Sequence, residues 1–213
     1  LQPNNSLKQK IAIIGSGPAG MAASSYLVQN GYQVDVFEKH DRVGGLMIYG
    51  IPNFKLDKNI VERRTQWLTE SGVKFHVNQD IGKDISFQDL EKDYDAILVA
   101  TGVYKARKLD IETSNIENSL PALDFLIESN KVGLGDNPSP NANLNAKDKH
   151  VVVIGGGDTA MDCVRTAIRQ NAKEVTCLYR RNKENMPGSA REVLNAEQEG
   201  IKFNWLSVPS KLI

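Results

Sequence analysis

A pattern that occurs twice constrains this fold more than any other feature of the sequence. Residues 11–30 read IAIIGSGPAGMAASSYLVQN, and residues 151–170 read VVVIGGGDTAMDCVRTAIRQ. Each copy consists of an apolar strand, a glycine-rich turn and a helix, and a second apolar strand follows at 33–37 and at 174–178. Two copies this far apart do not form a solenoid, which needs adjacent stacked repeats. The repeat therefore predicts two nucleotide-binding units in one chain.

The spacing of apolar residues extends this prediction to the other elements. We expect strands at 10–14, 33–37, 73–77, 94–100, 150–154, 174–178 and 201–206. We expect helices at 18–30, 59–70, 120–130, 158–170 and 189–199. Continuous apolar runs such as 10–14 and 94–100 are typical of parallel strands that are buried on both faces. The predicted fold class is therefore α/β, with two Rossmann-like dinucleotide-binding domains built on parallel sheets.

Composition excludes several other classes of protein. The 26 basic and 26 acidic residues cancel, so no excess charge favours binding to nucleic acid or to an anionic membrane. The uncharged segment 11–28 has the length of a membrane helix, but its glycines and Pro18 fit a strand, a turn and a helix start. We therefore expect no membrane segment and no signal peptide. Because the first residue is Leu1, we expect the chain to be a piece of a longer protein.

The only two cysteines, Cys163 and Cys177, exclude further kinds of site. An iron–sulfur cluster needs about four cysteine ligands, and a dithiol redox pair needs the C-x-x-C spacing. We expect both thiols to be reduced and buried in the core. Unpaired cysteines without a targeting segment favour a cytoplasmic location.

The first glycine turn, Gly15-Ser16-Gly17-Pro18-Ala19-Gly20, has the form G-x-G-x-x-G. It follows a buried strand, opens a helix and is followed by Glu38 at the end of the next strand, as dinucleotide binding requires. Gly15 allows the tight turn, Gly17 lets a pyrophosphate approach the helix N-terminus, and Gly20 lets the helix pack close to the strand. A carboxylate at Glu38 would accept from both ribose hydroxyls and repel a 2′-phosphate, so we expect FAD or NAD and not NADP. The alternative is a structural glycine turn beside a solvated glutamate.

The second glycine turn, Gly155-Gly156-Gly157-Asp158-Thr159-Ala160, has the form G-x-G-x-x-A. Ala160 replaces the third glycine, and we expect a slightly looser contact between helix and strand. An aromatic residue, Tyr179, stands where the first copy has its acid, and Arg180 and Arg181 follow. Two guanidinium groups at this position can bind a 2′-phosphate, so this turn is predicted to prefer NADPH over NADH. The alternative is that both arginines are ordinary surface charges.

An FAD site and an NADPH site in one chain indicate hydride transfer from nicotinamide C4 to flavin N5. This step needs the two rings at about 3–3.5 Å and needs no side-chain acid, base or nucleophile. We therefore expect no catalytic side chain and no metal ligand. The expected FAD-binding domain is 1–118, interrupted by an NADPH-binding domain at 119–213. A stretch at 131–149 that is rich in Asn, Pro, Gly and Asp is the expected linker and domain boundary.

Longer motifs carry a resemblance to a known family. They are Glu38-Lys39, Val43-Gly44-Gly45-Leu46, YGIPNFKL at 49–56, Ala100-Thr101-Gly102 and ENMPGS at 184–189. With the two turns, they resemble the small (β) subunits of NADPH-dependent glutamate synthases over essentially the whole chain. The N-terminal halves of dihydropyrimidine dehydrogenases and NADPH-linked ferredoxin oxidoreductase subunits share this plan.

The resemblance implies an activity and a set of contacts. In this family NADPH reduces FAD, and electrons pass through iron–sulfur clusters to an FMN in a large subunit, which makes glutamate from glutamine and 2-oxoglutarate. The implied FAD contacts are Gly15, Ser16, Gly17, Ala19, Gly20, Glu38, Lys39, Gly45, Leu46, Lys55, Ile81, Thr101 and Gly102. The implied NADPH contacts are Gly155, Gly156, Gly157, Asp158, Thr159, Ala160, Arg180 and Arg181, with Arg191 as a weaker candidate. For Leu46, Lys55 and Ile81, core packing or a solvated charge is the alternative.

The sequence departs from the family pattern in two places. The family has a cysteine-rich N-terminal segment for iron–sulfur clusters and a C-terminal return into the FAD domain, and this sequence has neither. We therefore expect a fragment that lacks part of the flavin pocket. Three hypotheses follow: an electron-input module that partners a glutamate synthase large subunit, the same module with ferredoxin or a pyrimidine-reducing domain as acceptor, or a nucleotide-binding module that passes no electrons.

Overall fold

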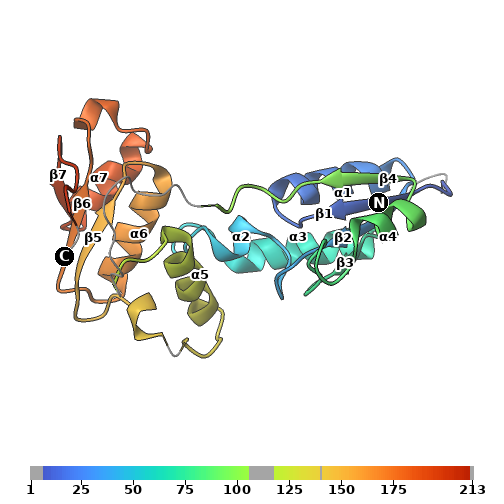
Figure 1. Cartoon of the computed structure of the whole chain (residues 1–213), viewed down its shortest axis with the longest axis horizontal. Coiled ribbons are helices and arrows are strands. Elements are labelled where there is room, and N and C mark those ends of the chain that lie inside the picture. Colours follow the sequence, from blue (N-terminus) through green and yellow to red (C-terminus); the bar gives the residue numbers. More distant parts are fainter. Residues whose placement is uncertain (1–6, 106–117, 140, 212–213) are drawn as a thin grey trace. The chain divides into compact units, whose positions relative to one another are not determined.

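The computed structural model describes residues 7–105, 118–139 and 141–211 of the chain. They form two compact units, Leu1–Tyr104 and Lys105–Ile213, and each unit contains one parallel sheet with helices packed on it (Figure 1). Each glycine turn lies in a different unit. The structure therefore confirms the predicted α/β fold with two parallel sheets.

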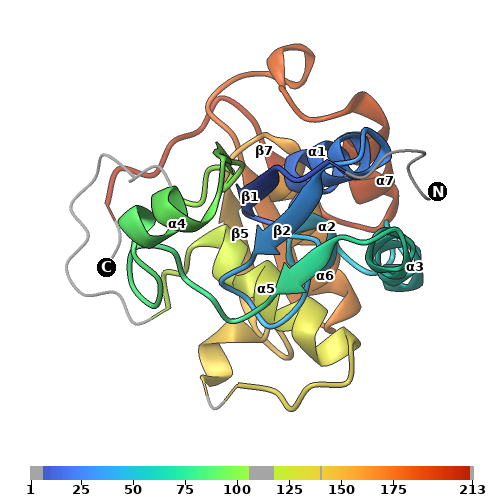
Figure 2. The same cartoon turned by 90° about the vertical axis from the view of Figure 1, so that its right-hand side faces the viewer.

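The first unit contains a four-stranded sheet with the order β3-β2-β1-β4. Its strands are β1 (Lys10–Ile14), β2 (Gln33–Phe37), β3 (Lys74–His76) and β4 (Ala96–Val99). All neighbours are parallel, and Ile14 pairs with Phe37 on one side and with Val99 on the other. The parallel strands β1 and β2 lie side by side in Figure 2. From β1 the chain continues to β2 and β3 on one side of the sheet and then crosses to β4 on the other side of β1. The position between β1 and β4 is therefore the switch point at which such sheets bind ligands.

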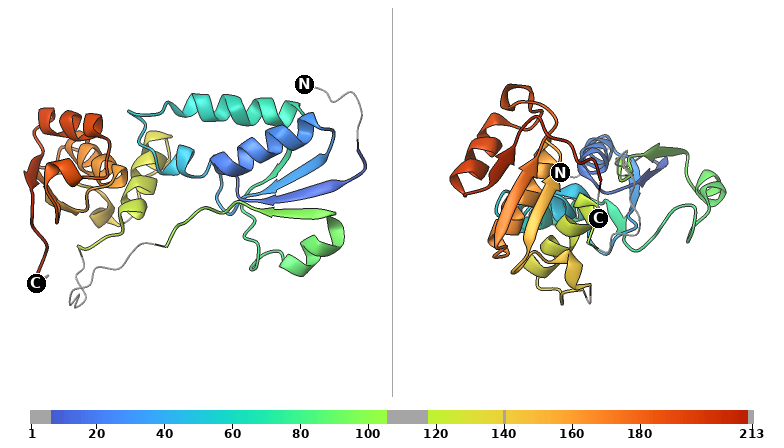
Figure 3. Two further views of the ribbon diagram at one scale, coloured as in Figure 1. Left: turned by 90° about the horizontal axis from the view of Figure 1, so that it is seen from above. Right: turned by 60° about the vertical axis from the view of Figure 1, so that its left-hand side comes forward.

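Helices cover both faces of this first sheet. Helices α1 (Pro18–Gln29) and α3 (Lys58–Glu70) lie on one face, and α4 (Phe87–Asp93) lies on the other (Figure 3, left). The alternation of side chains along the strands explains this division. Ile13 and Val36 face α1 and α3, where they pack with Met21 and Leu68. A short helix, α2 (Leu46–Tyr49), follows the second glycine-containing segment of this unit.

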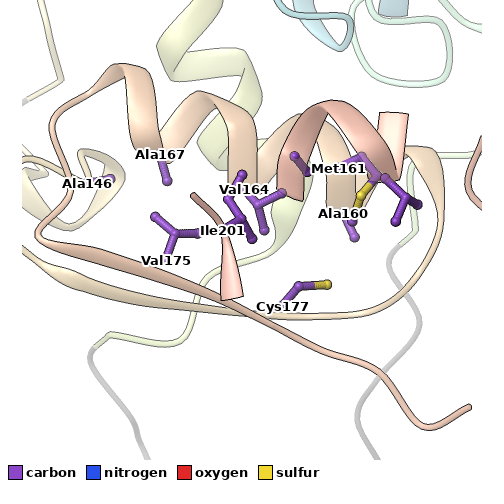
Figure 4. Packing of buried hydrophobic residues seen from close by; sticks show 10 residues of the cluster. Ala146, Ala160, Met161, Val164, Ala167, Val175, Cys177 and Ile201 are labelled. Carbon is purple, nitrogen blue, oxygen red and sulfur yellow. The ribbon is translucent and has the colours of Figure 1, made fainter. Parts of the chain in front are cut away.

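The second unit contains a three-stranded parallel sheet with the order β5-β6-β7. Its strands are β5 (His150–Ile154), β6 (Glu174–Leu178) and β7 (Lys202–Asn204). Helices α6 (Asp158–Arg169) and α7 (Ala190–Gln198) bury their apolar sides against β6, and α5 (Ala122–Gly133) packs on α6. Figure 4 shows Met161 and Val164 of α6 packed above Val175 and Cys177 of β6. Two short 3₁₀ turns, η1 (Ala142–Leu144) and η2 (Lys183–Asn185), complete the unit.

Most predicted elements are confirmed, and β1, β2, β5 and β6 have the predicted bounds. The prediction that 94–100 forms a strand buried on both faces was wrong. Strand β4 lies at the edge of its sheet, and Leu98 and Val99 are 40% and 60% exposed. Helices α2 and α4 were not predicted, because each is short and buries few apolar residues. Cys163 and Cys177 are free and buried, as predicted.

Along the chain, the boundary between the two units falls between Tyr104 and Lys105. The predicted boundary at 118/119 follows residues 106–117, which lie outside the described residues, and it stays a prediction. The stretch 131–149 does not separate the units, because it joins α5 to β5 within the second unit. Among the residues that the structure describes, no helix is both long enough and apolar enough to cross a membrane.

Candidate functional site

The first glycine turn lies at the carboxyl ends of β1, β2 and β4. Gly15 leaves β1 with φ = +105°, a conformation that favours glycine, and its N–H donates to the carbonyl of Phe37 (2.8 Å). A Cβ on Gly15 would lie 2.6 Å from the carbonyl oxygen of Ala100, at the end of β4. The turn therefore lies at the switch point of the sheet, where open α/β sheets bind ligands.

The start of α1 is close to this turn and leaves open space above it. A Cβ on Gly20 would lie 2.0 Å from the carbonyl oxygen of Gly15, so no other residue fits there without moving the helix. At Gly17, in contrast, no heavy atom of the described residues lies within 4 Å of the Cβ position. The helix has no side-chain cap, so no N-cap side chain accepts from the N–H groups that follow Pro18 in its first turn. Open space beside unpaired N–H groups is what a pyrophosphate requires.

The Glu38 carboxylate closes the turn from the side of β2. It is only 5% exposed, and its Oε2 accepts hydrogen bonds from the N–H (3.0 Å) and the hydroxyl (2.5 Å) of Ser16. Its Oε1 accepts from the N–H of His40 (2.9 Å). A carboxylate offers about four lone-pair positions, so these three donors leave room for about one ribose hydroxyl. The sequence predicted contact with two hydroxyls, and the second one requires Ser16 or His40 to move.

A second glycine segment packs on the first turn. A Cβ on Gly45 would lie 2.8 Å from the Cα of Gly17, and the Ser16 hydroxyl accepts the N–H of Gly44 (3.1 Å). Leu46 then begins α2 and is 40% exposed. The buried ammonium of Lys58 donates to the carbonyl oxygens of Met47 (2.9 Å) and Ile51, which fixes α2 against α3. Lys58 was not predicted from the sequence, because no pattern indicates a buried cation there.

Four further predicted residues lie in loops of the first unit. Thr101 and Gly102 follow β4 and are exposed. Ile81 is half-buried on the α4 face, in a segment whose Gln79 N–H donates to the carbonyl of Glu38 (2.9 Å). Lys55 lies in the turn between α2 and α3 with its side chain exposed. Contact of these residues with a nucleotide stays a prediction.

The sequence analysis also missed Tyr104, which follows β4. Its ring lies 4.4 Å from the ammonium of Lys39, measured to the ring centroid, so the two form a cation–π pair. Its hydroxyl lies 3.7 Å from the Cβ position of Gly45. Burial, followed by the charge of Glu38, raises the pKa of the Tyr104 hydroxyl, which therefore keeps its proton and can donate. No local pattern could have revealed this contact, because the partners are far apart in the sequence.

The second glycine turn repeats the framework but closes it with an aromatic ring. The N–H of Gly155 donates to the carbonyl of Leu178 (3.1 Å) at the end of β6. A Cβ on Gly156 would lie 2.4 Å from the ring of Tyr179, which is 7% exposed. At Gly157 the Cβ position is again open among the described residues. Ala160 carries a Cβ where the first turn has Gly20, and a Cβ on Gly155 would lie 3.6 Å from it. The looser contact between α6 and its strand stays a prediction.

Arginine side chains follow Tyr179 directly. Arg180 and Arg181 are exposed, and in the described part of the chain neither forms an ion pair or a side-chain hydrogen bond. Arg191 is also exposed, in the first turn of α7. By contrast, Arg165 and Arg169 are engaged with glutamates of the same unit. Two uncommitted guanidinium groups therefore lie at the end of β6, where the ribose of a bound dinucleotide is expected.

Known proteins with similar sequences include the small chains of bacterial glutamate synthases. The glutamate synthase [NADPH] small chain of Azospirillum brasilense is 54% identical over 209 residues, which cover 97% of this chain and 43% of that protein. The corresponding small chain of Escherichia coli (strain K12) is 46% identical over 199 residues, which cover 92% of this chain and 42% of that protein. The chain therefore spans less than half the length of both relatives.

A solved structure and a family model lead to the same fold. Mycobacterium tuberculosis FprA in complex with NADPH matches with a TM-score of 0.71 at 22% identity, over 89% of this chain and 47% of that chain. The model of the family described as pyridine nucleotide-disulphide oxidoreductase matches residues 9–213. The chain thus belongs to the pyridine nucleotide-disulphide oxidoreductase family.

Proposed function

We propose that this chain is the electron-input module of a flavin oxidoreductase, which binds FAD at the first glycine turn and NADPH at the second and passes a hydride from NADPH to FAD. The observation that carries the proposal is the difference between the residues that close the two turns. A buried carboxylate, Glu38, closes the first, and an aromatic ring with two uncommitted arginines closes the second. One chain therefore holds one site that rejects a 2′-phosphate and one that attracts it.

The first turn fits the adenosine and pyrophosphate parts of FAD. The open space at Gly17 and the unpaired N–H groups of α1 suit two phosphates. Glu38 has an acceptor position left for a ribose hydroxyl, and Lys39 and Tyr104 lie beside it. In this assignment Gly45 and Leu46 extend the site toward the flavin.

The second turn fits NADPH by the same reasoning. Gly157 leaves space for the pyrophosphate at the start of α6, where Thr159 is exposed. Arg180 and Arg181 then bind the 2′-phosphate with charge-assisted hydrogen bonds. No carboxylate occupies the position of Glu38, because Tyr179 stands there. The residues present therefore suit a nucleotide with three phosphates.

When bound, the nicotinamide and the flavin supply the hydride donor and acceptor, so the protein needs no catalytic side chain for this step. The residues of this chain bind and orient the two adenosine halves. Similarity to the small chains of NADPH-dependent glutamate synthases supports a finer assignment, in which a large subunit uses the electrons to make glutamate. The same proposal places the protein in the cytoplasm, where the free Cys163 and Cys177 stay reduced.

Anaerobic stopped-flow spectroscopy of the intact protein tests this proposal. We expect a yellow protein whose flavin absorbance is bleached by NADPH much faster than by NADH. A colourless protein that binds NADPH but cannot be reconstituted with FAD would instead be a nucleotide-binding module without electron transfer. Addition of a glutamate synthase large subunit with glutamine and 2-oxoglutarate then tests the finer assignment, and reduction of ferredoxin in its place would assign another acceptor.

A further inference from the structure

The segment Asn182–Ser189, here called the strap, lies against the second glycine turn. Three hydrogen bonds hold it there. The hydroxyl of Tyr179 donates to the carbonyl of Asn185 (3.0 Å), and the N–H of Gly188 donates to the carbonyl of Gly156 (2.9 Å). The third joins the N–H of Ser189 to the carboxylate of Asp158 (2.9 Å).

The fit between strap and turn is close. A Cβ on Gly188 would lie 3.0 Å from the carbonyl oxygen of Gly156 and 3.4 Å from the carbonyl carbon of Gly157. A Cβ at this position would make tight contacts, so the strap or the turn would have to shift by a few tenths of an ångström. The strap is therefore held in one place by backbone contacts as well as by the three hydrogen bonds.

Asp158 is unusual among the residues of the turn, because a carboxylate near a pyrophosphate opposes binding by charge repulsion. Its position gives it another use. Asp158 is the first residue of α6, and Ser189, whose N–H it accepts, is the N-cap of α7. One carboxylate thus joins the positive N-terminal ends of two helices, both of which favour a negative charge.

The Asp158 link joins the N-cap of α7 to the turn, and ion pairs join α7 to α6 both in its first turn and at its C-cap. Arg165 of α6 contacts Glu192 (2.6 Å) and Glu199 (2.8 Å). The first turn of α7 also carries the exposed Arg191. Without the Asp158 link, Glu192 would still hold the first turn of α7 on α6, but the strap and the N-cap residue Ser189 would lose a contact with the glycine turn.

We infer that Asp158 is a positioning residue for 2′-phosphate selectivity, which docks the strap and the start of α7 on the glycine turn and does not itself bind the nucleotide. The inference rests on the proposed NADPH site. In this inference, the preference for NADP⁺ over NAD⁺ depends on the charges of the arginines and also on their distance from the turn, which the docked strap maintains.

Isothermal titration of the intact, FAD-loaded protein with NADP⁺ and with NAD⁺ tests the inference. The variants are Asp158→Ala, which removes the acceptor, and Asp158→Asn, which removes the charge but keeps an acceptor oxygen. Asp124→Ala is the matched control, because Asp124 is an exposed acid in the first turn of α5. The wild type must first bind NADP⁺ more tightly than NAD⁺, and its failure to do so would overturn the proposed function itself.

We expect Asp158→Ala to raise the Kd for NADP⁺ about tenfold, the effect of losing one hydrogen bond to a charged group, and to change the Kd for NAD⁺ less than about twofold. Asp158→Asn keeps an acceptor oxygen but loses the charge, so it should raise the Kd for NADP⁺ clearly less than Asp158→Ala does, and Asp124→Ala should change neither Kd. Equal losses for both nucleotides, unchanged binding in Asp158→Ala, or a loss in Asp158→Asn as large as in Asp158→Ala would each overturn the inference. Melting temperatures of all variants separate a loss of fold from a loss of selectivity.

A second variant acts on the strap from the opposite side. Gly188→Ala places a methyl group against the carbonyl of Gly156 and leaves Asp158 intact. We expect it to lower the preference for NADP⁺ over NAD⁺ several-fold, by displacing the strap. An unchanged preference in this variant would contradict a role for the docked strap.

Discussion

The two glycine turns share one framework, but different side chains close them. In the first unit the carboxylate of Glu38 accepts hydrogen bonds from Ser16 and His40 and closes the turn with charge. In the second unit the ring of Tyr179 packs against Gly156 and closes the turn with an apolar surface. Under the proposed function, the strand–turn–helix framework binds the phosphates in both units, and the residue after the second strand selects the ribose.

The turns also differ at the third position of the glycine motif, which lies on the helix and faces the turn. A Cβ on Gly20 would lie 2.0 Å from the carbonyl oxygen of Gly15, whereas Ala160 carries a Cβ at the corresponding place in the second unit. The first turn thus depends on a missing side chain where the second does not. We therefore expect Gly20→Ala and Ala160→Gly to lower stability by different amounts.

The largest expected effect concerns the arginines of the second turn. In a variant with Arg180→Ala and Arg181→Ala, each lost phosphate contact should cost roughly 1.5–3 kcal/mol, so the Kd for NADPH should rise at least about a hundredfold. The Kd for NADH should stay nearly unchanged. Removal of two other exposed cations of the same unit, Lys147→Ala with Lys173→Ala, is the control. Equal losses for NADPH and NADH would refute the assignment of the 2′-phosphate.

Gly20→Ala should have the next largest effect. The new methyl group meets a backbone oxygen, which cannot rotate away, so we expect the first unit to lose about 3 kcal/mol of stability. The reverse change in the second unit, Ala160→Gly, should cost about 1–2 kcal/mol, through helix propensity and the loss of a buried methyl group. Urea unfolding measures both free energies. Similar costs at the two positions would show that the helices approach their strands equally closely.

Glu38→Gln tests the charge that closes the first turn. The amide keeps one acceptor oxygen but presents an NH₂ group to donors of Ser16 or His40, so charge-assisted hydrogen bonds are lost at a cost of about 2 kcal/mol. We expect a higher Kd for FAD, measured by the return of flavin fluorescence on dilution. Glu62→Gln, at an exposed position of α3, is the control. FAD affinity at the wild-type level would mean that Glu38 is not part of the ribose site.

The smallest expected effect concerns the stability of the second unit at low pH, where Glu199 takes up a proton. The guanidinium of Arg169, with that of Arg165, holds the pKa of Glu199 at about 2, below its ordinary value of 4.5. Because the charged form is favoured in the folded state, this contribution is complete above pH 4.5 and is lost as the pH falls toward 2. Allowing for solvent screening, we expect a loss of about 1 kcal/mol. Unfolding at both ends of this range should show a loss that is about 1 kcal/mol larger in the wild type than in Glu199→Gln, because the other carboxylates titrate in both proteins.

The repeated pattern made much of the fold predictable. Strands β1 and β5 are continuous apolar runs directly before glycine turns, so both their bounds and their parallel pairing followed from the sequence. The exposure of β4 did not follow, because an apolar run does not reveal whether a strand lies at an edge of its sheet. Helix α4 was missed because only Leu90 is buried in it.

The candidate site was predictable where it depended on local order in the sequence. The turns, Glu38 and the arginine pair follow strands at fixed distances, and the structure places each at the carboxyl edge of its sheet. The contacts of Tyr104 with Lys39 and of Asp158 with Ser189 join residues that no spacing rule connects. Such contacts depend on how loops pack, and they required the structure.

A crystal structure of the intact protein grown with FAD and NADP⁺ tests the central claim most directly. The account predicts the FAD ribose within about 3 Å of the Glu38 carboxylate. It predicts the 2′-phosphate of NADP⁺ against Arg180 and Arg181, beside the second turn. A 2′-phosphate bound at the first turn, or both arginines turned to solvent with NADP⁺ in place, would contradict it.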